Sequence, residues 1–324
     1  MRSLIAVFML AVTPLAAYAD DPLSRFAPLL AANPTGLVFH HTAPLEGFVP
    51  DAPTLQGPSD EGLRKALLGE TGLDPVSGLD WDAVTGTLTI GAPPNDLLVM
   101  LGTEGFAGGV EAALLARDFE RHDITGLPVL AKGDDNRVDV ANARQPDPFA
   151  GGMGKAQRVA LGDGFIAVGR NWPSINAALE SLNNIDGAAA VWRATLDALA
   201  RCRGDNHLDA AWGWGADSFA GMLIDGDIDA AIAAIEGGPQ LLFPPFPLAI
   251  FALDRADNAT HLRIALPYST VESATAAADY VAKGLALFPN APAPPDVKLI
   301  EAGTQTVAVM TRAIRQVKPA PPMP

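Results

Sequence analysis

The best candidate for a transition-metal site in this sequence is the alternating set Asp205, His207 and Asp209. If the stretch is extended, all three side chains lie on one face. Two carboxylates and an imidazole can together coordinate an ion such as zinc. The alternative is a solvated loop that follows a helix, because Asp and Asn are common turn residues. The sequence therefore predicts either a metal site or a polar loop here.

A second acidic group has the spacing of a calcium-binding loop. Asp225, Asp227 and Asp229 occupy its first, third and fifth positions, and Glu236 occupies the twelfth. Such a loop has Gly at its sixth position, where the chain turns sharply, but this chain has Ala230 there. The competing interpretation is a helix that begins near these aspartates and is capped by one of them. A calcium site stays open as an expectation.

Two tryptophans form the candidate ligand-binding pair. Trp212 and Trp214 are separated by one glycine, so they share a face if the chain is extended. Aromatic rings on one face can stack on a sugar or another flat ligand. They can equally pack against a helix as part of the core.

Sequence signatures of catalysis are missing. The stretch at 151–155, GGMGK, resembles a phosphate-binding loop, but Phe149 and Ala156 replace the Gly and the Ser or Thr that this motif requires. No G-x-S-x-G motif occurs either. A dispersed triad would leave no local motif, so a hydrolase in which His122 or His207 meets a carboxylate remains an alternative. No cofactor is predicted.

The first nineteen residues predict export. Arg2 is followed by an apolar run over 4–12 and by a small-x-small cleavage site that ends at Ala19. This order is typical of a secretory signal peptide, and the apolar run is shorter than the roughly 20 residues that span a bilayer. We therefore expect a periplasmic or secreted protein that does not insert into the membrane after cleavage.

Composition excludes several classes of function. The formal net charge is −15, which opposes binding to nucleic acids and anionic lipids. Cys202 is the single cysteine, so the chain has no intramolecular disulfide. Helical spacing around Cys202 predicts a buried, inert thiol near a helix end at Gly204.

The distribution of apolar residues predicts helices that alternate with hairpins. Strands are expected at 35–41, 84–90, 97–101, 127–131, 158–161, 165–169, 248–253, 261–266, 297–300 and 306–310. Helices are expected at 59–68, 106–117, 174–182, 190–203 and 269–287, the last with a capping box of Ser269 and Glu272. A polar loop is expected at 132–154. Hairpins packed on helices, without regular βαβ alternation, indicate an α+β fold.

Two similarly built halves are expected within this fold. The predicted segments are a signal peptide at 1–19, halves at 20–186 and 187–317, and a proline-rich tail at 318–324. An ungapped match of residues 100–101 to 222–223 places the segment 106–113 on 228–235 and hints at an internal repeat.

These observations together favour an exported, non-enzymatic protein that binds a small ligand or a protein partner. A periplasmic hydrolase with an unrecognised site and a calcium-stabilised structural module are the alternatives.

Overall fold

The computed structural model describes residues 23–32, 36–41, 71–91, 95–137, 149, 156–183, 186–215, 246–256, 259–286 and 295–314. The predicted signal peptide, the helix expected at 59–68 and the proline-rich tail lie outside these residues. None of the described helices has the length and apolar character that crossing a bilayer requires.

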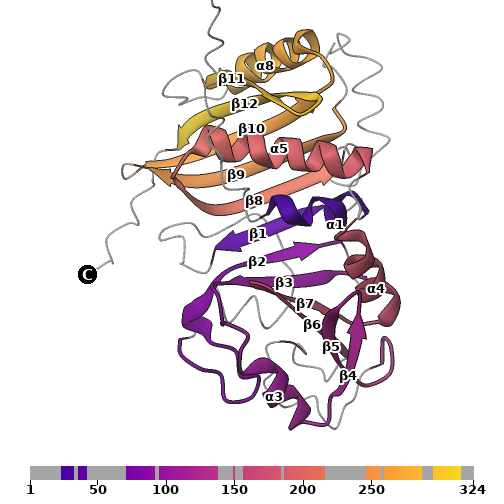
Figure 1. Ribbon diagram of the computed structural model, residues 1–324. Helices are drawn as coiled ribbons and strands as arrows, with labels where there is room; N and C mark the ends of the chain where they lie inside the picture. Colours follow the sequence, from indigo (N-terminus) through magenta and orange to yellow (C-terminus); the bar gives the residue numbers. More distant parts are fainter. Residues whose placement is uncertain are drawn as a thin grey trace, which may run out of the picture.

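The described strands form one continuous sheet, and Figure 1 shows them stacked from one end of the molecule to the other. Their order across the sheet is β11-β12-β10-β9-β8-β1-β2-β3-β7-β6-β5-β4. The strands are β1 (Leu37–His41), β2 (Val84–Ile90), β3 (Leu97–Gly102), β4 (Glu120–Ile124), β5 (Leu127–Lys132), β6 (Gln157–Gly162), β7 (Phe165–Gly169), β8 (His207–Gly215), β9 (Leu248–Ala256), β10 (Ala259–Tyr268), β11 (Asp296–Ala302) and β12 (Gln305–Ile314).

Every pair of neighbouring strands in this sheet is antiparallel. In the hairpin of β6 and β7, Asp163 and Gly164 form a two-residue turn, and Gly164 has φ +66°. A positive φ is strained for most residues and easy for glycine, so Gly164 suits this position of the turn. The predicted α+β class, with antiparallel hairpins packed against helices, is confirmed.

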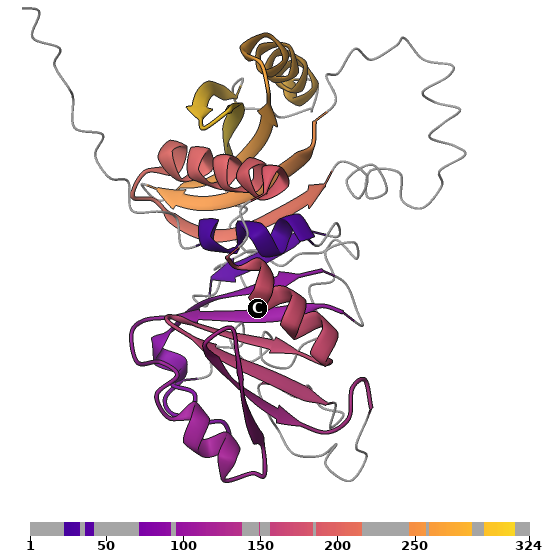
Figure 2. The same ribbon diagram turned by 45° about the vertical axis from the view of Figure 1, so that its right-hand side comes forward.

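Helices cover both faces of the sheet. They are η1 (Ser24–Phe26), α1 (Ala27–Ala32), η3 (Trp81–Ala83), α3 (Val110–Leu115), α4 (Trp172–Ser181), α5 (Gly187–Arg203) and α8 (Val271–Ala286). We call the face that carries α1, α4 and α5 the first face, and the face that carries α3 and α8 the second face (Figure 2).

Strand β3 is buried on both faces, because successive side chains point in opposite directions. Leu97 and Val99 belong to the large core of the first face. Leu98 and Met100 pack with α3 on the second face. Helices cover this strand on both sides, so its side chains on both faces are apolar and its sequence is a continuous apolar run.

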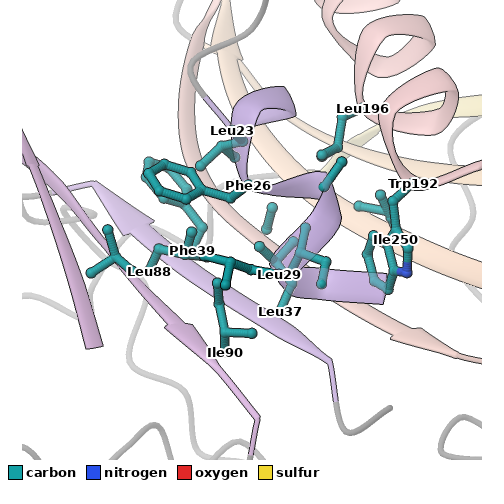
Figure 3. Close-up of a cluster of buried hydrophobic side chains, with 14 of the residues drawn as sticks. Leu23, Phe26, Leu29, Leu37, Phe39, Leu88, Ile90, Trp192, Leu196 and Ile250 are labelled. Carbon is teal, nitrogen blue, oxygen red and sulfur yellow. The ribbon is translucent and has the colours of Figure 1, made fainter. Parts of the chain in front are cut away.

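The centre of the first-face core lies where β1 meets β8. Leu37 and Phe39 of β1 gather with Leu29 of α1, and Trp192 of α5 joins the same cluster (Figure 3). Helix α1 packs against both α5 and α4. Because α1 directly precedes β1, the pairing of this short strand fixes where α1 lies.

The described elements follow the same order twice along the chain. Elements α1-β1-β2-β3-α3-β4-β5 correspond to α5-β8-β9-β10-α8-β11-β12. In the sheet, β10 pairs directly with β12, whereas the β6-β7 hairpin separates β3 from β5. The first series therefore contains an additional unit, β6-β7-α4, which the second series lacks.

This correspondence differs from the repeat expected from sequence. It relates α3 to α8, whereas the ungapped match pairs 106–113 with 228–235, and the latter segment lies outside the described residues. Helix α5 begins at Gly187. The division of the chain into halves at 20–186 and 187–317 stays a prediction.

The expected helix starts need correction. Helices α4 and α5 begin at Trp172 and Gly187 rather than at 174 and 190. Helix α3 begins at Val110 rather than at 106, because hydrogen-bonded turns occupy the residues before it. Helix α8 is capped by Thr270, whose Oγ1 accepts a hydrogen bond from the backbone N of Ser273 at 3.2 Å, and not by Ser269.

A buried ion pair connects β9 to β10 on the first face. Arg263 donates from Nε and Nη2 to the carboxylate of Asp254, which has no exposed surface. Nη1 of Arg263 donates to Oγ1 of Thr311 at 2.9 Å and approaches Sγ of Cys202 at 3.4 Å. Burial lowers the pKa of Arg263, but the hydrogen bond and charge of Asp254 outweigh burial and leave that pKa raised.

The thiol of Cys202, which is expected to be buried, is half-buried rather than fully buried.

We expect Arg263→Met to lower the free energy of unfolding by about 3–5 kcal/mol, because it leaves the Asp254 carboxylate buried without its guanidinium partner, with the side-chain amide of Asn206 still donating to it. Urea denaturation measures this loss. The double variant Asp254→Asn with Arg263→Met should recover much of the loss, since it removes the unpaired charge. Equal losses in the single and double variants would contradict this account.

Gly36, at the start of β1, should be intolerant of a side chain. Its φ is +102°, and an added Cβ would collide with the backbone oxygen of Gly213 on β8. We expect Gly36→Ala to destabilise the protein by about 2–4 kcal/mol, from backbone strain and from the clash. Gly105→Ala is the matched control, because Gly105 has φ +83° but open space around it. Thermal denaturation should show a clearly smaller loss for Gly105→Ala, and equal losses would argue against a tight β1–β8 junction.

Candidate functional site

A cavity of about 280 Å³ opens on the first face between α4, the end of α1 and the start of β3. It lies beside the additional unit β6-β7-α4. Its lining residues are Ala32, Asn95, Leu97, Pro173, Ser174, Ala177, Ala178 and Ser181. This lining has no ionisable side chain, so the cavity combines apolar surface with amide and hydroxyl groups.

Helix α4 supplies most of the lining because of where its apolar residues fall. Ile175 and Leu179 recur at helical spacing and are buried against the sheet. The adjacent stripe carries small residues, which leave room for a cavity between α4 and α1. Ser174 and Ala177 belong to this stripe.

The beginning of α4 is fixed by Asn171, its N-cap. Oδ1 of Asn171 accepts a hydrogen bond from the backbone N of Ser174 at 2.7 Å. Its Nδ2 donates to Oδ1 of Asn95 at 3.2 Å and to Oδ1 of Asn136 at 3.3 Å. The helix start is therefore tied to the start of β3 and to the segment after β5.

Arg158 of β6 holds that segment in place. Its guanidinium donates to Oδ1 of Asp135 at 2.6 Å and to the backbone O of Gly133 at 2.9 Å. The same carboxylate accepts from the backbone N of Trp172 at distances of 3.1 and 3.2 Å. Arg158 is only 2 % exposed and lies 4.8 Å from the centre of the Trp172 ring. This network makes the surroundings of the cavity rigid, because each partner is held by at least one other.

The polar loop expected at 132–154 contributes to this network at its beginning. Residues 133–137 are described, and Asn136 among them adopts φ +57°. Phe149 is buried in the core of the second face with α3. The other residues of this predicted loop lie outside the described part of the chain.

The three residues of the alternating metal candidate do not converge. Asp209 is 1 % exposed, and its Oδ1 accepts from Nε and Nη2 of Arg255 at 2.9 and 2.7 Å. The pairing of β8 with β9 shifts between Leu208 and Ala210, so Asp209 is an extra residue that breaks the expected alternation. Asp205 and His207 are exposed. Among the described residues, no group of three His, Cys, Asp or Glu side chains is arranged to hold a metal ion.

The tryptophan pair lies on β8, as an extended pair on one face. Trp212 is 8 % exposed and clusters with Ala210 and Leu253. The Trp214 ring meets the Phe251 ring edge-on, with centroids 5.8 Å apart. Both tryptophans pack in a cluster of the second face, away from the cavity, and their role in ligand binding stays a prediction.

Other predicted site residues are placed as follows. Asp225, Asp227 and Asp229 lie outside the described residues, so the calcium hypothesis stays a prediction. The His122 ring packs edge-on against Trp172, with centroids 4.8 Å apart, and its Nε2 lies 3.9 Å from Glu120.

Sequence reasoning missed Asn95, Asn136 and Asn171 as partners. Asn95 follows two prolines, an arrangement that is typical of a turn. The sequence Asn171-Trp-Pro, just before a helical pattern, does carry an N-cap signal. Nothing local indicates that the same amide reaches residues 35 and 76 positions away.

No family model matches the chain, and no curated protein matches it. Among solved structures, three crystal forms of TP0453 are similar over most of their length. Form III covers 90% of this chain and 94% of that chain at 10% identity, with a TM-score of 0.35. The match to form I covers 91% of this chain and 93% of that chain at 9% identity, with a TM-score of 0.35. The match to form IV covers 91% of this chain and 94% of that chain at 10% identity, with a TM-score of 0.38. Likeness at this level carries no argument about function.

We expect Asn171→Ala to cost about 1 kcal/mol of stability through loss of the α4 cap, and also to free the Asn95 amide. Asp186→Ala removes the cap of α5, where Oδ1 accepts from the backbone N of Ala189 at 2.8 Å, and serves as the control. Chemical denaturation should give similar losses for both variants. Only Asn171→Ala should shift the NMR signals of the Asn95 side chain, and an unchanged Asn95 signal would contradict the network.

Proposed function

We propose that this protein is an exported, non-enzymatic binding protein of the periplasm, which holds a small ligand in the cavity beside α4. The observation that carries the proposal is the cavity itself: about 280 Å³ with an uncharged lining of mixed polarity. Small-molecule sites are typically concave and mostly apolar, with a few fixed polar groups. A volume just below the usual range of about 300–1,000 Å³ suits a small ligand.

The groups around the cavity support binding rather than catalysis. Its lining supplies no imidazole, thiol, amine or carboxylate that could act as an acid, base or nucleophile. The two lining hydroxyls are both engaged: Ser174 Oγ lies 3.4 Å from Oδ1 of Asn95, and Ser181 Oγ donates to the backbone O of Ala178 at 2.9 Å. A serine nucleophile needs an adjacent base, which neither hydroxyl contacts here.

The rigidity of the surroundings also supports binding. The N-cap network and the Arg158–Asp135 ion pair fix the cavity wall before a ligand arrives, which reduces the entropic cost of binding. The location in the periplasm rests on the signal peptide expected from sequence, and the charge of −15 argues against a nucleic-acid ligand.

The test is native mass spectrometry of the mature protein, purified gently from its own periplasm, before and after denaturation. We expect a small additional mass that is lost on denaturation. Ala177→Trp should abolish this mass, because Ala177 is exposed, lines the cavity and can carry a ring that fills it.

The control is Ala276→Trp, an exposed alanine on α8, which should retain the additional mass. A wild-type protein without additional mass, or equal loading of Ala177→Trp, would contradict the proposal.

A further inference from the structure

The hydrogen bonds around the α4 N-cap dictate which way three amide side chains point. A backbone N–H can only donate, so the atom of Asn171 that meets the N–H of Ser174 at 2.7 Å must be its oxygen. The nitrogen of Asn171 then faces the other two amides. Asn95 and Asn136 must consequently turn their oxygens toward Asn171, as observed.

The consequence for the cavity is that Asn95 presents a donor. Its oxygen already accepts from Asn171 at 3.2 Å and lies 3.4 Å from Ser174 Oγ. Its NH₂ group has no acceptor among the described residues, and Asn95 is an exposed residue of the cavity lining. Turning the amide over would place two NH₂ groups against each other, so the donor orientation is locked.

Among the residues that the structure describes, the rest of the lining offers no partner to a charged ligand. A cation would find no carboxylate in the lining, and an anion would find no Arg, Lys or His there. The overall charge of −15 further opposes an anion. Leu97 and Ala178, both buried, supply an apolar floor beside the amide.

We propose that the cavity selects small neutral molecules in which a carbonyl oxygen adjoins an apolar carbon skeleton, with Asn95 Nδ2 as the donor to that oxygen. This inference rests on the proposed function and names the ligand class of the same site. Ketones and tertiary amides have this chemistry: they accept a hydrogen bond and donate none.

The test is an NMR titration of the mature protein with cyclopentanone, followed through the side-chain NH₂ signals of Asn95. Cyclopentylammonium is the comparison probe, because it has the same ring but a cationic donor in place of the acceptor. We expect cyclopentanone to shift the Asn95 signals saturably, with a dissociation constant on the order of millimolar for so small a molecule. Cyclopentylammonium should leave them unchanged.

Asn95→Asp tests the donor directly. The carboxylate retains an acceptor for Asn171 but has no hydrogen to donate, so cyclopentanone binding, followed on the signals of Ala177, should weaken about tenfold. Asn183→Asp adds the same charge at an exposed position after α4, outside the network and the cavity lining, and it should leave binding unchanged within about twofold.

The outcomes separate the two proposals. Cyclopentanone binding that survives Asn95→Asp, or equal binding of cyclopentylammonium, overturns the donor inference but keeps the cavity as a ligand site. If cyclopentanone does not bind and the native protein releases a different class of molecule, the donor inference is wrong but the cavity remains a ligand site. If neither probe binds and the native protein carries no additional mass, both proposals fail.

Discussion

The pairing of strand β1 with both of its neighbours holds the two parts of the sheet together. Strand β1 pairs with β2 on one edge and with β8 on the other. These two ladders join the strands on either side of β1 into one sheet. Gly36 lets the chain enter this strand at a point where the backbone of β8 leaves no room for a side chain. Helix α1 precedes β1 directly, so the same pairing holds α1 between α5 and α4 and places Ala32 at the rim of the cavity.

The cavity belongs to the part of the fold that is not repeated. Among the described elements, two series follow the same order, and the β6-β7 hairpin and α4 belong to the first series. This unit brings Arg158, which anchors the segment after β5, and Asn171, which starts α4 and orients Asn95. The proposed binding site on an additional unit agrees with the general separation of fold and function, in which the framework is shared and the site is local.

The sequence predicts elements well where local signals agree. The hairpin at 158–169 follows from a Gly-containing turn between two apolar runs, and α4 and α5 follow from their helical periodicity. Strand β4 escapes prediction because it is a charged edge strand, with Glu120, Arg121 and Asp123 toward solvent. The stretch around Asp209 reads as a polar loop or metal site, whereas it lies in β8, because Arg255 neutralises the buried carboxylate from a strand 46 residues away. The cavity is missed for the same reason: its polar wall depends on amides that are distant in sequence.

The most direct test of this account is a crystal structure of the mature protein purified from its own source without refolding. We expect electron density for a small molecule in the cavity, with an oxygen within hydrogen-bond distance of Asn95 Nδ2 and carbon atoms against Leu97 and Ala178. A cavity filled by α1 or α4 side chains, or a co-purified molecule bound at another place with the cavity holding only water, would contradict it.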